Sequence, residues 1–499
     1  MKKIVILFSL IVSFSFAQPT VTVQDPTDVS STSAKLKAKV NLPNGWTTFQ
    51  GNVKVYIHLT NKSTNSTTEA YTKTYTSGNF GGEYSFSKTV TDLSKGTNYE
   101  YYATATEANW GTVYSTSETK AFTTPTDTLK VPSAYSTIQA GLNAATSGDV
   151  VLVSAGTYTE NIIWPNVNGI KLMSAGDSSN TIIDGGGTSS VIYMNPSSAT
   201  IDTTTLIQGF KITNGGNVAF GAGIFVKNSS PKFNKVKIAN NSASEYGGGL
   251  YFESTASVIR NTSIDNNKAS YGAGGIYMTK TLSNGKSPSS MIISNTIIKL
   301  NSGPTGGGLN VYQMSSLTLL SVEFIENDGG NTGGGMKSQD TKLIISDSKF
   351  VKNESGSGGG WHGYELKESI FTNCIFNGNS ADNGGAIDCL SGNVKFINTR
   401  FINNEADTSG VRGMGGAIYH SSSTITIDSS IISSNQSKTG GGIYTGISGS
   451  SVISNSIISK NIAYELGAGI FFAPQGNVPN PITLTNVTIS NNSAPDGNG

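Results

Sequence analysis

Three residues that could do acid–base chemistry recur at a nearly fixed spacing. Lys337, His362 and Asp388 lie 25 and 26 positions apart, and each directly follows a glycine-rich step into an apolar residue. An amine, an imidazole and a carboxylate held together could transfer protons during cleavage of a polymer. They can meet only if the chain repeats a structural unit of about that length.

Such a unit does repeat. The glycine-to-apolar step occurs ten times, mostly 25 to 27 residues apart, and an apolar-x-x-Asn signal alternates with it. Each unit holds short β-branched or aromatic runs separated by Gly and Asn, without helical periodicity. The pattern predicts a parallel β-helix over residues 126–499, in which each repeat is one coil and like positions stack.

The repeated asparagines are expected to be structural. In stacked coils each amide can donate to one neighbour and accept from the other, which forms a ladder along the axis. An unpaired buried amide costs about 1–3 kcal/mol, so only a continuous ladder stabilises the coils. The ten positions are Asn241, Asn267, Asn301, Asn327, Asn353, Asn379, Asn404, Asn435, Asn461 and Asn492.

The column that contains Lys337, His362 and Asp388 should point outward by strand alternation. Aromatic residues flank this trio, and exposed rings can stack on sugars, so one hypothesis is a polysaccharide-binding stripe. The alternatives are an aromatic ladder that only stabilises the coils, by about 0.5–1.5 kcal/mol per pair, and catalysis through the trio. The remaining members, all candidate ligand-binding residues, are Phe225, Tyr251, Tyr277, Asn310, Tyr419, Tyr444 and Phe471.

Two known families resemble this part of the chain. Gly-Gly-Ala-Ile at 384–387 and 415–418, with Phe-x-x-Asn at 324–327, 350–353, 376–379 and 401–404, is similar to polymorphic outer-membrane protein repeats. That resemblance covers roughly 205–499 and implies a surface-displayed passenger, several family members being adhesins. The stretch from Ile138 to Asn161 resembles the opening coil of pectin-lyase-like right-handed β-helices, a fold that often hosts lyases and glycosidases.

The N-terminal elements differ from the repeats. Ser136-Thr137-Ile138-Gln139 predicts a capping box, and Ile138, Leu142 and Ala145 fall on one face of a short helix that would cover the first coil. Residues 18–125 hold alternating runs separated by turns, which predicts a β-sandwich. Within them, Leu93 to Tyr101 resembles the end of a fibronectin type III domain. The fold class is therefore all-β.

Residues 1–17 predict a signal peptide, because Lys2 and Lys3 precede an apolar run that ends at Ala17. The protein is expected to be secreted or held at the cell surface, associated with the outer membrane, as a monomer without a transmembrane helix in the mature chain. The charge balance, 33 basic against 32 acidic residues, argues against nucleic-acid binding. No cofactor or metal site is indicated. Cys374 and Cys389 could pair or remain two buried thiols.

Three insertions, at about 279–290, 405–413 and 472–481, could carry binding loops or be simple linkers. The chain stops at Gly499, where another glycine pair is due, and we expect further coils beyond it. The sequence favours adhesion or polysaccharide binding, directed at an extracellular glycan or a host or cell-surface ligand. The alternative is a polysaccharide lyase or glycoside hydrolase, although no Asp-Asp pair occurs and only three histidines exist.

Overall fold

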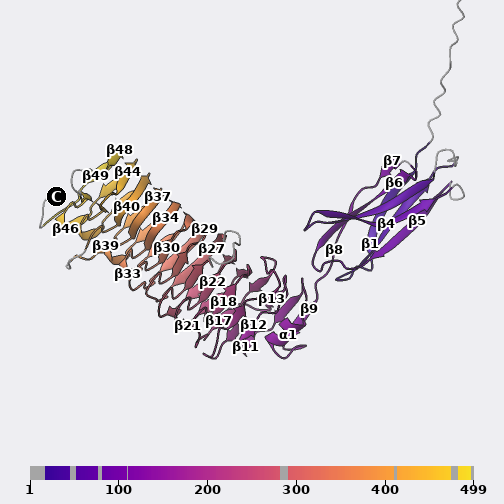
Figure 1. Ribbon diagram of the computed structural model, residues 1–499, viewed down its shortest axis with the longest axis horizontal. Coiled ribbons are helices and arrows are strands. Elements are labelled where there is room, and N and C mark those ends of the chain that lie inside the picture. The colour runs from indigo at the N-terminus through magenta and orange to yellow at the C-terminus, as the bar shows by residue number, and fades with distance from the viewer. Residues whose placement is uncertain are drawn as a thin grey trace, which may run out of the picture. The chain divides into compact units, whose positions relative to one another are not determined.

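The computed structural model describes residues 17–44, 52–76, 81–109, 111–280, 290–408, 413–473 and 481–495. Almost all of the signal segment, the centres of the three insertions and the last four residues lie outside these ranges. The chain divides into two compact units, Met1–Asp127 and Thr128–Gly499. Antiparallel sheets form the first unit and a parallel β-solenoid of about 13 turns forms the second, which confirms the predicted all-β class (Figure 1).

The N-terminal unit is built from two antiparallel sheets around one core. Inward residues alternate with outward ones, as in β2, where Leu36, Ala38 and Val40 are fully buried. The Tyr99 hydroxyl accepts a hydrogen bond from the Ser94 amide at 2.9 Å, which ties a strand to the loop that precedes it. One sheet has the order β1 (Thr20–Thr27), β2 (Ala34–Leu42), β5 (Gly82–Val90); the other has β4 (Ser66–Tyr75), β3 (Val53–Asn61), β6 (Asn98–Glu107) and β7 (Val113–Thr116), with β8 (Lys120–Thr123) also on β6.

The solenoid stacks three parallel sheets, which we number by the order of their strands in a coil. Sheet 1 comprises β12 (Ile162–Ile163), β15 (Ile192–Met194), β18 (Ile224–Lys227), β22 (Leu250–Glu253), β26 (Ile276–Thr279), β28 (Leu309–Tyr312), β30 (Met336–Gln339), β43 (Ile443–Thr445) and β47 (Ile470–Phe472). Sheet 2 comprises β9 (Thr128–Val131), β10 (Val150–Val153), β13 (Lys171–Ser174), β16 (Leu206–Gln208), β19 (Lys232–Asn234), β23 (Val258–Arg260), β31 (Lys342–Ser346), β44 (Ser450–Ser454) and β48 (Ile482–Thr485). Sheet 3 comprises β11 (Gly156–Thr159), β14 (Thr181–Asp184), β17 (Lys211–Thr213), β20 (Lys237–Ala239), β24 (Ser263–Asp265), β32 (Lys349–Val351), β35 (Ile375–Asn377), β38 (Arg400–Ile402), β41 (Ile431–Ser433), β45 (Ile457–Ser459) and β49 (Thr488–Ser490).

Some strands continue from one sheet into the next. Sheets 1 and 2 share β34 (Trp361–Thr372), β37 (Ile387–Ile397) and β40 (Ile418–Asp428), and sheets 2 and 3 share β27 (Ser290–Lys299) and β29 (Ser316–Ile325). A further parallel side sheet, which the repeat pattern did not predict, follows the repeated asparagines. It comprises β33 (Glu354–Ser357), β36 (Ser380–Asn383), β39 (Glu405–Ala406), β42 (Gln436–Thr439) and β46 (Ile462–Leu466), and a separate pair joins β21 (Ser242–Ala243) to β25 (Lys268–Ala269).

Stacking of like positions produces one continuous core in the solenoid. Ile238 of one coil pairs in register with Ile264 of the next, 26 residues later. The rings of Phe324, Phe350 and Phe376 are fully buried and stack with centroids 4.7 and 4.5 Å apart. Each repeat therefore buries its apolar face only against its neighbours, which makes the coil-to-coil register the main determinant of the fold.

Glycine is required at the two positions of each pair for separate reasons. The first glycine of a pair adopts a left-handed conformation, with φ of 66° at Gly333 and 71° at Gly415, which other L residues rarely accept. The second glycine lies against the next coil, since a Cβ at Gly334 would lie 2.4 Å from the Gly359 carbonyl oxygen. Each pair therefore turns the chain and also lets two coils approach closely.

Helix α1 (Ile138–Ala144) covers the first coil, but its cap differs from the predicted capping box. Thr137, not Ser136, is the N-cap and accepts a hydrogen bond from the Ala140 amide. The Glu160 carboxylate accepts from the Ile138 and Gln139 amides at 2.8 and 2.9 Å, so the free amides at the helix start are satisfied from outside. In the described residues, no helix has the length and apolarity needed to cross a bilayer.

Candidate functional site

The structure places Lys337, His362 and Asp388 side by side on three successive coils. They occupy paired positions on β30, β34 and β37. The His362 Nδ1 atom lies 3.4 Å from the Asp388 Oδ2 atom. Within this trio, His362 is 6% and Asp388 3% exposed, whereas Lys337 is half-buried, so the column is less exposed than predicted. The column points away from the solenoid core but is covered by the segments that lead into the glycine steps.

Contacts within a coil and between successive coils show how this cover is made. The Asn310 amide donates to the Thr305 hydroxyl at 2.9 Å, and Thr305 lies just before the glycine step of its own coil. The Phe220 ring lies 5.1 Å from the Tyr251 ring of the next coil, and the Tyr246 ring lies 4.7 Å from the Tyr277 ring of the next coil. Sequence reasoning missed this layer because it assigned no packing role to the residues between each repeated Asn and the next glycine step.

The aromatic members of the column stack on one another. Phe225 and Tyr251 are 5.3 Å apart at 7°, and Tyr251 and Tyr277 are 5.7 Å apart at 3°. Phe225 is 8% and Tyr251 7% exposed, so their ring faces meet neighbouring coils rather than solvent. Tyr419, Tyr444 and Phe471 stack in the same manner further along, with centroids 5.4 and 5.1 Å apart. Buried and mutually stacked faces cannot also stack on a sugar ring.

The electrostatics of the trio reflect its burial. Burial lowers the pKa of Lys337. In the same column, burial raises the pKa of Tyr277 to about 12, and the nearby Tyr246 adds a smaller effect. The His362 Nδ1 atom forms no hydrogen bond, because its 3.4 Å contact with the Asp388 Oδ2 atom is too poorly aligned, and the Asp388 Oδ1 atom has no hydrogen-bond partner among the described residues. Acid–base groups are therefore juxtaposed, but under a layer that separates them from a polymer outside.

Three other reactive side chains are also buried in the solenoid. Cys374 and Cys389 are free thiols, and burial raises the pKa of each to about 12. The His420 ring is hydrogen-bonded by its Nδ1 atom to Ser423 and by its Nε2 atom to Thr445 and Ser451. Burial lowers the pKa of His420 to about 4, so this imidazole is neutral near pH 7. Neutral thiols and a neutral imidazole inside a core are suited to packing rather than nucleophilic chemistry.

The ten repeated asparagines lie in one file. Each Nδ2 atom donates to the Oδ1 atom of the next asparagine at 2.9–3.0 Å, through all nine steps from Asn241 to Asn492. The same Nδ2 atom also donates to a backbone carbonyl of the preceding coil, as Asn379 does to Phe350 at 2.9 Å. These amides have no donor or acceptor left for a ligand. Within the described ranges, no group of three or more His, Cys, Asp or Glu is arranged to hold a metal ion.

An open groove of about 460 Å³ crosses three coils where sheet 2 turns into sheet 3. Its lining comes from β20, β24 and β27 and from the bends before them, where Asn261 and Asn295 adopt left-handed φ of 52° and 49°. Sequence reasoning did not single out this groove, although outward Lys211 and Lys237 at a spacing of 26 were a signal for it. The lining residues are Ser178, Lys235, Val236, Lys237, Asn261, Thr262, Ser263, Asp265, Asn295, Ile297 and Lys299.

The groove carries an excess of positive charge. Its one carboxylate, Asp265, lies 3.4 Å from the Lys237 ammonium and accepts a hydrogen bond from the Ser263 hydroxyl. Lys235 and Lys299 form no ion pair with any residue that the structure describes, and Lys232 and Arg260 extend the positive surface nearby. Further along the solenoid several lysines are paired, as in Lys349–Glu323 at 2.7 Å and Lys367–Asp340 at 3.1 Å. The groove differs from those surfaces because it holds two lysines that form no ion pair with the described residues.

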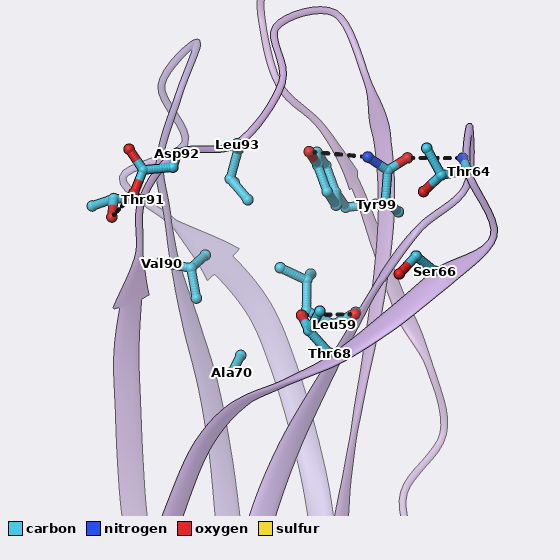
Figure 2. A pocket seen from close by; sticks show the side chains of 11 residues that line it. Leu59, Thr64, Ser66, Thr68, Ala70, Val90, Thr91, Asp92, Leu93 and Tyr99 are labelled. Carbon is cyan, nitrogen blue, oxygen red and sulfur yellow. Dashed lines mark hydrogen bonds between the residues drawn. The ribbon is translucent and has the colours of Figure 1, made fainter.

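The N-terminal unit has a hollow of its own at one end (Figure 2). About 330 Å³ lies between β3, β4 and the segment 90–93, over a floor that includes Leu59, Ala70 and Leu93. Its polar groups mainly satisfy one another: the Asn61 side chain accepts from the Thr64 amide, and Thr91 donates to Asp92. Because Asp92 is the one charged group in the lining, this hollow offers little to orient a ligand.

Comparison with known proteins assigns no activity to these residues. No family model matches the chain, and no curated protein matches it. Among solved structures, the longer form of the sensor domain of the anti-sigma factor RsgI4 from Pseudobacteroides cellulosolvens has 17% identity over 21% of this chain and 87% of its own, with a TM-score of 0.16. A shorter form of that domain has 16% identity over 22% of this chain and 98% of its own, with a TM-score of 0.17.

Proposed function

We propose that this protein is exported to the cell surface and binds an extracellular polysaccharide, of the anionic class, in the groove around Lys235. The observation that carries the proposal is an open groove across three successive coils that contains two lysines without carboxylate partners. The predicted signal segment at residues 1–17 supports export. Adhesion is the role that follows for a surface protein of this kind.

A polymer suits the groove because the groove is lined by residues of successive coils. Successive coils are about 4.8 Å apart, so equivalent groups recur in a straight line. Asn261 and Asn295 occupy equivalent positions one coil apart and are linked by a hydrogen bond of 3.4 Å. The half-buried Ser263 adds a hydroxyl beside them. Amides and hydroxyls both donate and accept hydrogen bonds, as the hydroxyl groups of a sugar chain require.

The charge of the groove favours an anionic chain. Three lysines face one aspartate, and Lys237 already neutralises that aspartate. A uronate carboxylate or a sulfate group on successive sugar units would supply the anionic partners that Lys235 and Lys299 lack. Each exposed contact is worth about 0–1 kcal/mol, so affinity requires several contacts along one chain and depends on salt.

Binding of polygalacturonate and alginate, compared with neutral dextran, tests this function. We expect the Lys235→Gln/Lys299→Gln double variant of the full chain to bind the anionic polymers about tenfold more weakly, a loss of about 1.4 kcal/mol. Raising the salt from about 0.05 to about 0.5 M should weaken the wild type similarly.

The matched control is Lys349→Gln/Lys352→Gln, because these solenoid lysines already pair with Glu323 and Glu326. This control should bind the anionic polymers like the wild type. Equal losses in both double variants would indicate a non-specific effect of net charge. Unchanged binding by Lys235→Gln/Lys299→Gln would refute the proposed groove.

A further inference from the structure

An aromatic row lies on the outer face of the five-stranded sheet of the N-terminal unit. Tyr56 and His58 on β3 and Tyr102 on β6 alternate with the buried residues of those strands, so they point away from the core. The His58 and Tyr102 rings stack at 4.7 Å and 21°, and the Tyr56 ring lies 5.9 Å from that of His58. The outer face of an antiparallel sheet is usually polar, so three adjoining rings there indicate a binding surface.

A hollow of about 390 Å³ adjoins this row on the same face. Glu100 precedes Tyr102 by two residues on β6, and strand alternation turns both side chains outward. Glu100 pairs in register with Ala121 of β8, and Asn98 pairs with Thr123. These four residues and Lys62 line the hollow, together with parts of Tyr99 and Phe122. A concave site with converging polar groups therefore lies beside an aromatic row.

The charges of this site cancel. The Lys62 ammonium lies 3.0 Å from the Glu100 carboxylate, and the Thr123 hydroxyl donates to the Asn98 side chain at 2.6 Å. The Nε2 atom of His58 and the Thr104 hydroxyl are hydrogen-bonded at 3.0 Å, and burial lowers the pKa of His58, which keeps the imidazole neutral near pH 7. The Lys54 ammonium lies 4.9 Å from the centre of the Tyr56 ring, and Glu69 pairs in register with His58, so these two charges also offset each other. The site thus combines aromatic rings, hydroxyls, an amide and balanced charges, without net charge.

We propose that this surface, Tyr56, His58 and Tyr102 with the hollow at Lys62, Asn98, Glu100 and Thr123, is a second carbohydrate site that takes a neutral glycan. Tyr102 meets another aromatic ring only at His58 among the described residues, so it can also contact the apolar C–H face of a pyranose. Asn98, Thr123 and the Glu100–Lys62 pair would bind the hydroxyls of a sugar seated in the hollow. Charge balance distinguishes this site from the positive groove of the solenoid.

The test uses the full chain and neutral polymers, namely xylan, mannan and hydroxyethyl cellulose, in about 0.5 M NaCl, where contacts of the lysine groove are screened. We expect one of them to bind, and Tyr102→Ser to reduce that affinity at least about tenfold. Glu100→Gln should weaken binding less, because it keeps a hydrogen-bonding side chain on the rim and removes only the charge that pairs with Lys62. Glu83→Gln is the matched control, since Glu83 forms a similar exposed ion pair with Lys39 on the other sheet.

Two results would overturn the inference: no binding to any of the neutral polymers, or equal binding by wild type, Tyr102→Ser and Glu100→Gln. Glu100→Gln keeps the test informative if Tyr102→Ser unfolds, because Glu100 is a partly exposed rim residue. Capture of a protein instead of a glycan by this face would also contradict it. Binding of anionic polymers through Lys235 and Lys299 at low salt is measured separately, so failure of one site leaves the other standing.

Discussion

Each repeated asparagine is saturated with hydrogen bonds. The Asn379 Oδ1 atom accepts from both the backbone and the side-chain nitrogen of Asn353, at 3.0 Å each. Its Nδ2 atom donates to the Phe350 carbonyl and to the Asn404 Oδ1 atom, at 2.9 Å each. No other side chain of this size supplies two donors and a twofold acceptor, and an aspartate would place a charge in the core.

Replacing one member of the file should therefore destabilise the solenoid. Asn379→Ala removes the oxygen that accepts from the Asn353 backbone and side-chain nitrogens, the donor to the Phe350 carbonyl, and one of the two donors to the Asn404 oxygen, at a cost of about 3 kcal/mol in the free energy of unfolding. Urea denaturation followed by circular dichroism measures this change. Asn377→Ala is the control, because this half-buried side chain only accepts one weak hydrogen bond from Asn403 at 3.4 Å. Equal losses in the two variants would show that the file adds nothing.

His420 should make the solenoid sensitive to acid. Its pKa is about 4 in the folded protein and about 6.5 when unfolded, so the unfolded state binds a proton more readily. This stability is complete above about pH 6.5 and is lost as the pH falls towards 4, by up to about 3 kcal/mol. Free energies of unfolding between pH 4 and 7 should fall more steeply for wild type than for His420→Gln. Parallel pH profiles would refute this role.

At the scale of elements, tight contact between coils explains why the glycine step repeats. Sequence reasoning predicted the step and the stacked coils because every coil must satisfy the same backbone geometry. The sequence reasoning overestimated the exposure of the column that contains Tyr251 and His362. Strand alternation shows which way a side chain points but not which residues lie above it. The layer that covers the column has a weak pattern of its own: Phe220, Tyr246 and Thr305 share a place in the coil, but only the first two are aromatic.

Two glycines with different surroundings test the close approach. In Gly334→Ala the added Cβ would lie 2.4 Å from the Gly359 oxygen, so the coils must separate, at a cost of about 3 kcal/mol. In Gly378→Ala the left-handed φ of 65° costs about 1 kcal/mol, and the nearest atom is a flexible Lys352 carbon at 3.6 Å. Thermal unfolding should give a clearly larger drop for Gly334→Ala. The reverse order would contradict the proposed close packing.

At the scale of the whole molecule, repetition made the fold predictable and the binding surfaces difficult to foresee. Core positions such as Phe350 and Phe376 must match the coil above and below, so their period appears in the sequence. Outward positions need not match the coil above and below, and the lysines at 235, 237 and 299 do not share one repeated column. The surface around Tyr102 depends on strand pairing between β3, β6 and β8, which are far apart in the chain.

The two proposed sites, one in each unit, differ in the charge of the ligand that they should bind. The solenoid groove has unpaired lysines and should take anionic chains, whereas the outer face around Tyr102 is neutral and should take neutral ones. A surface polymer that carries both kinds of sugar unit would then be held at two places on one chain. Such linked binding strengthens attachment without requiring either site to be strong.

The central claim is that Lys235 and its neighbours contact the anionic groups of a bound polysaccharide. Carbodiimide coupling of oligogalacturonate to the full chain tests it most directly, because amide bonds form only where a carboxylate rests against a lysine amine. Mass spectrometry should locate these bonds at Lys235, Lys237 and Lys299, and excess unlabelled polygalacturonate should suppress them. Coupling spread evenly over the exposed lysines, or concentrated at Lys349 and Lys352, would contradict the claim.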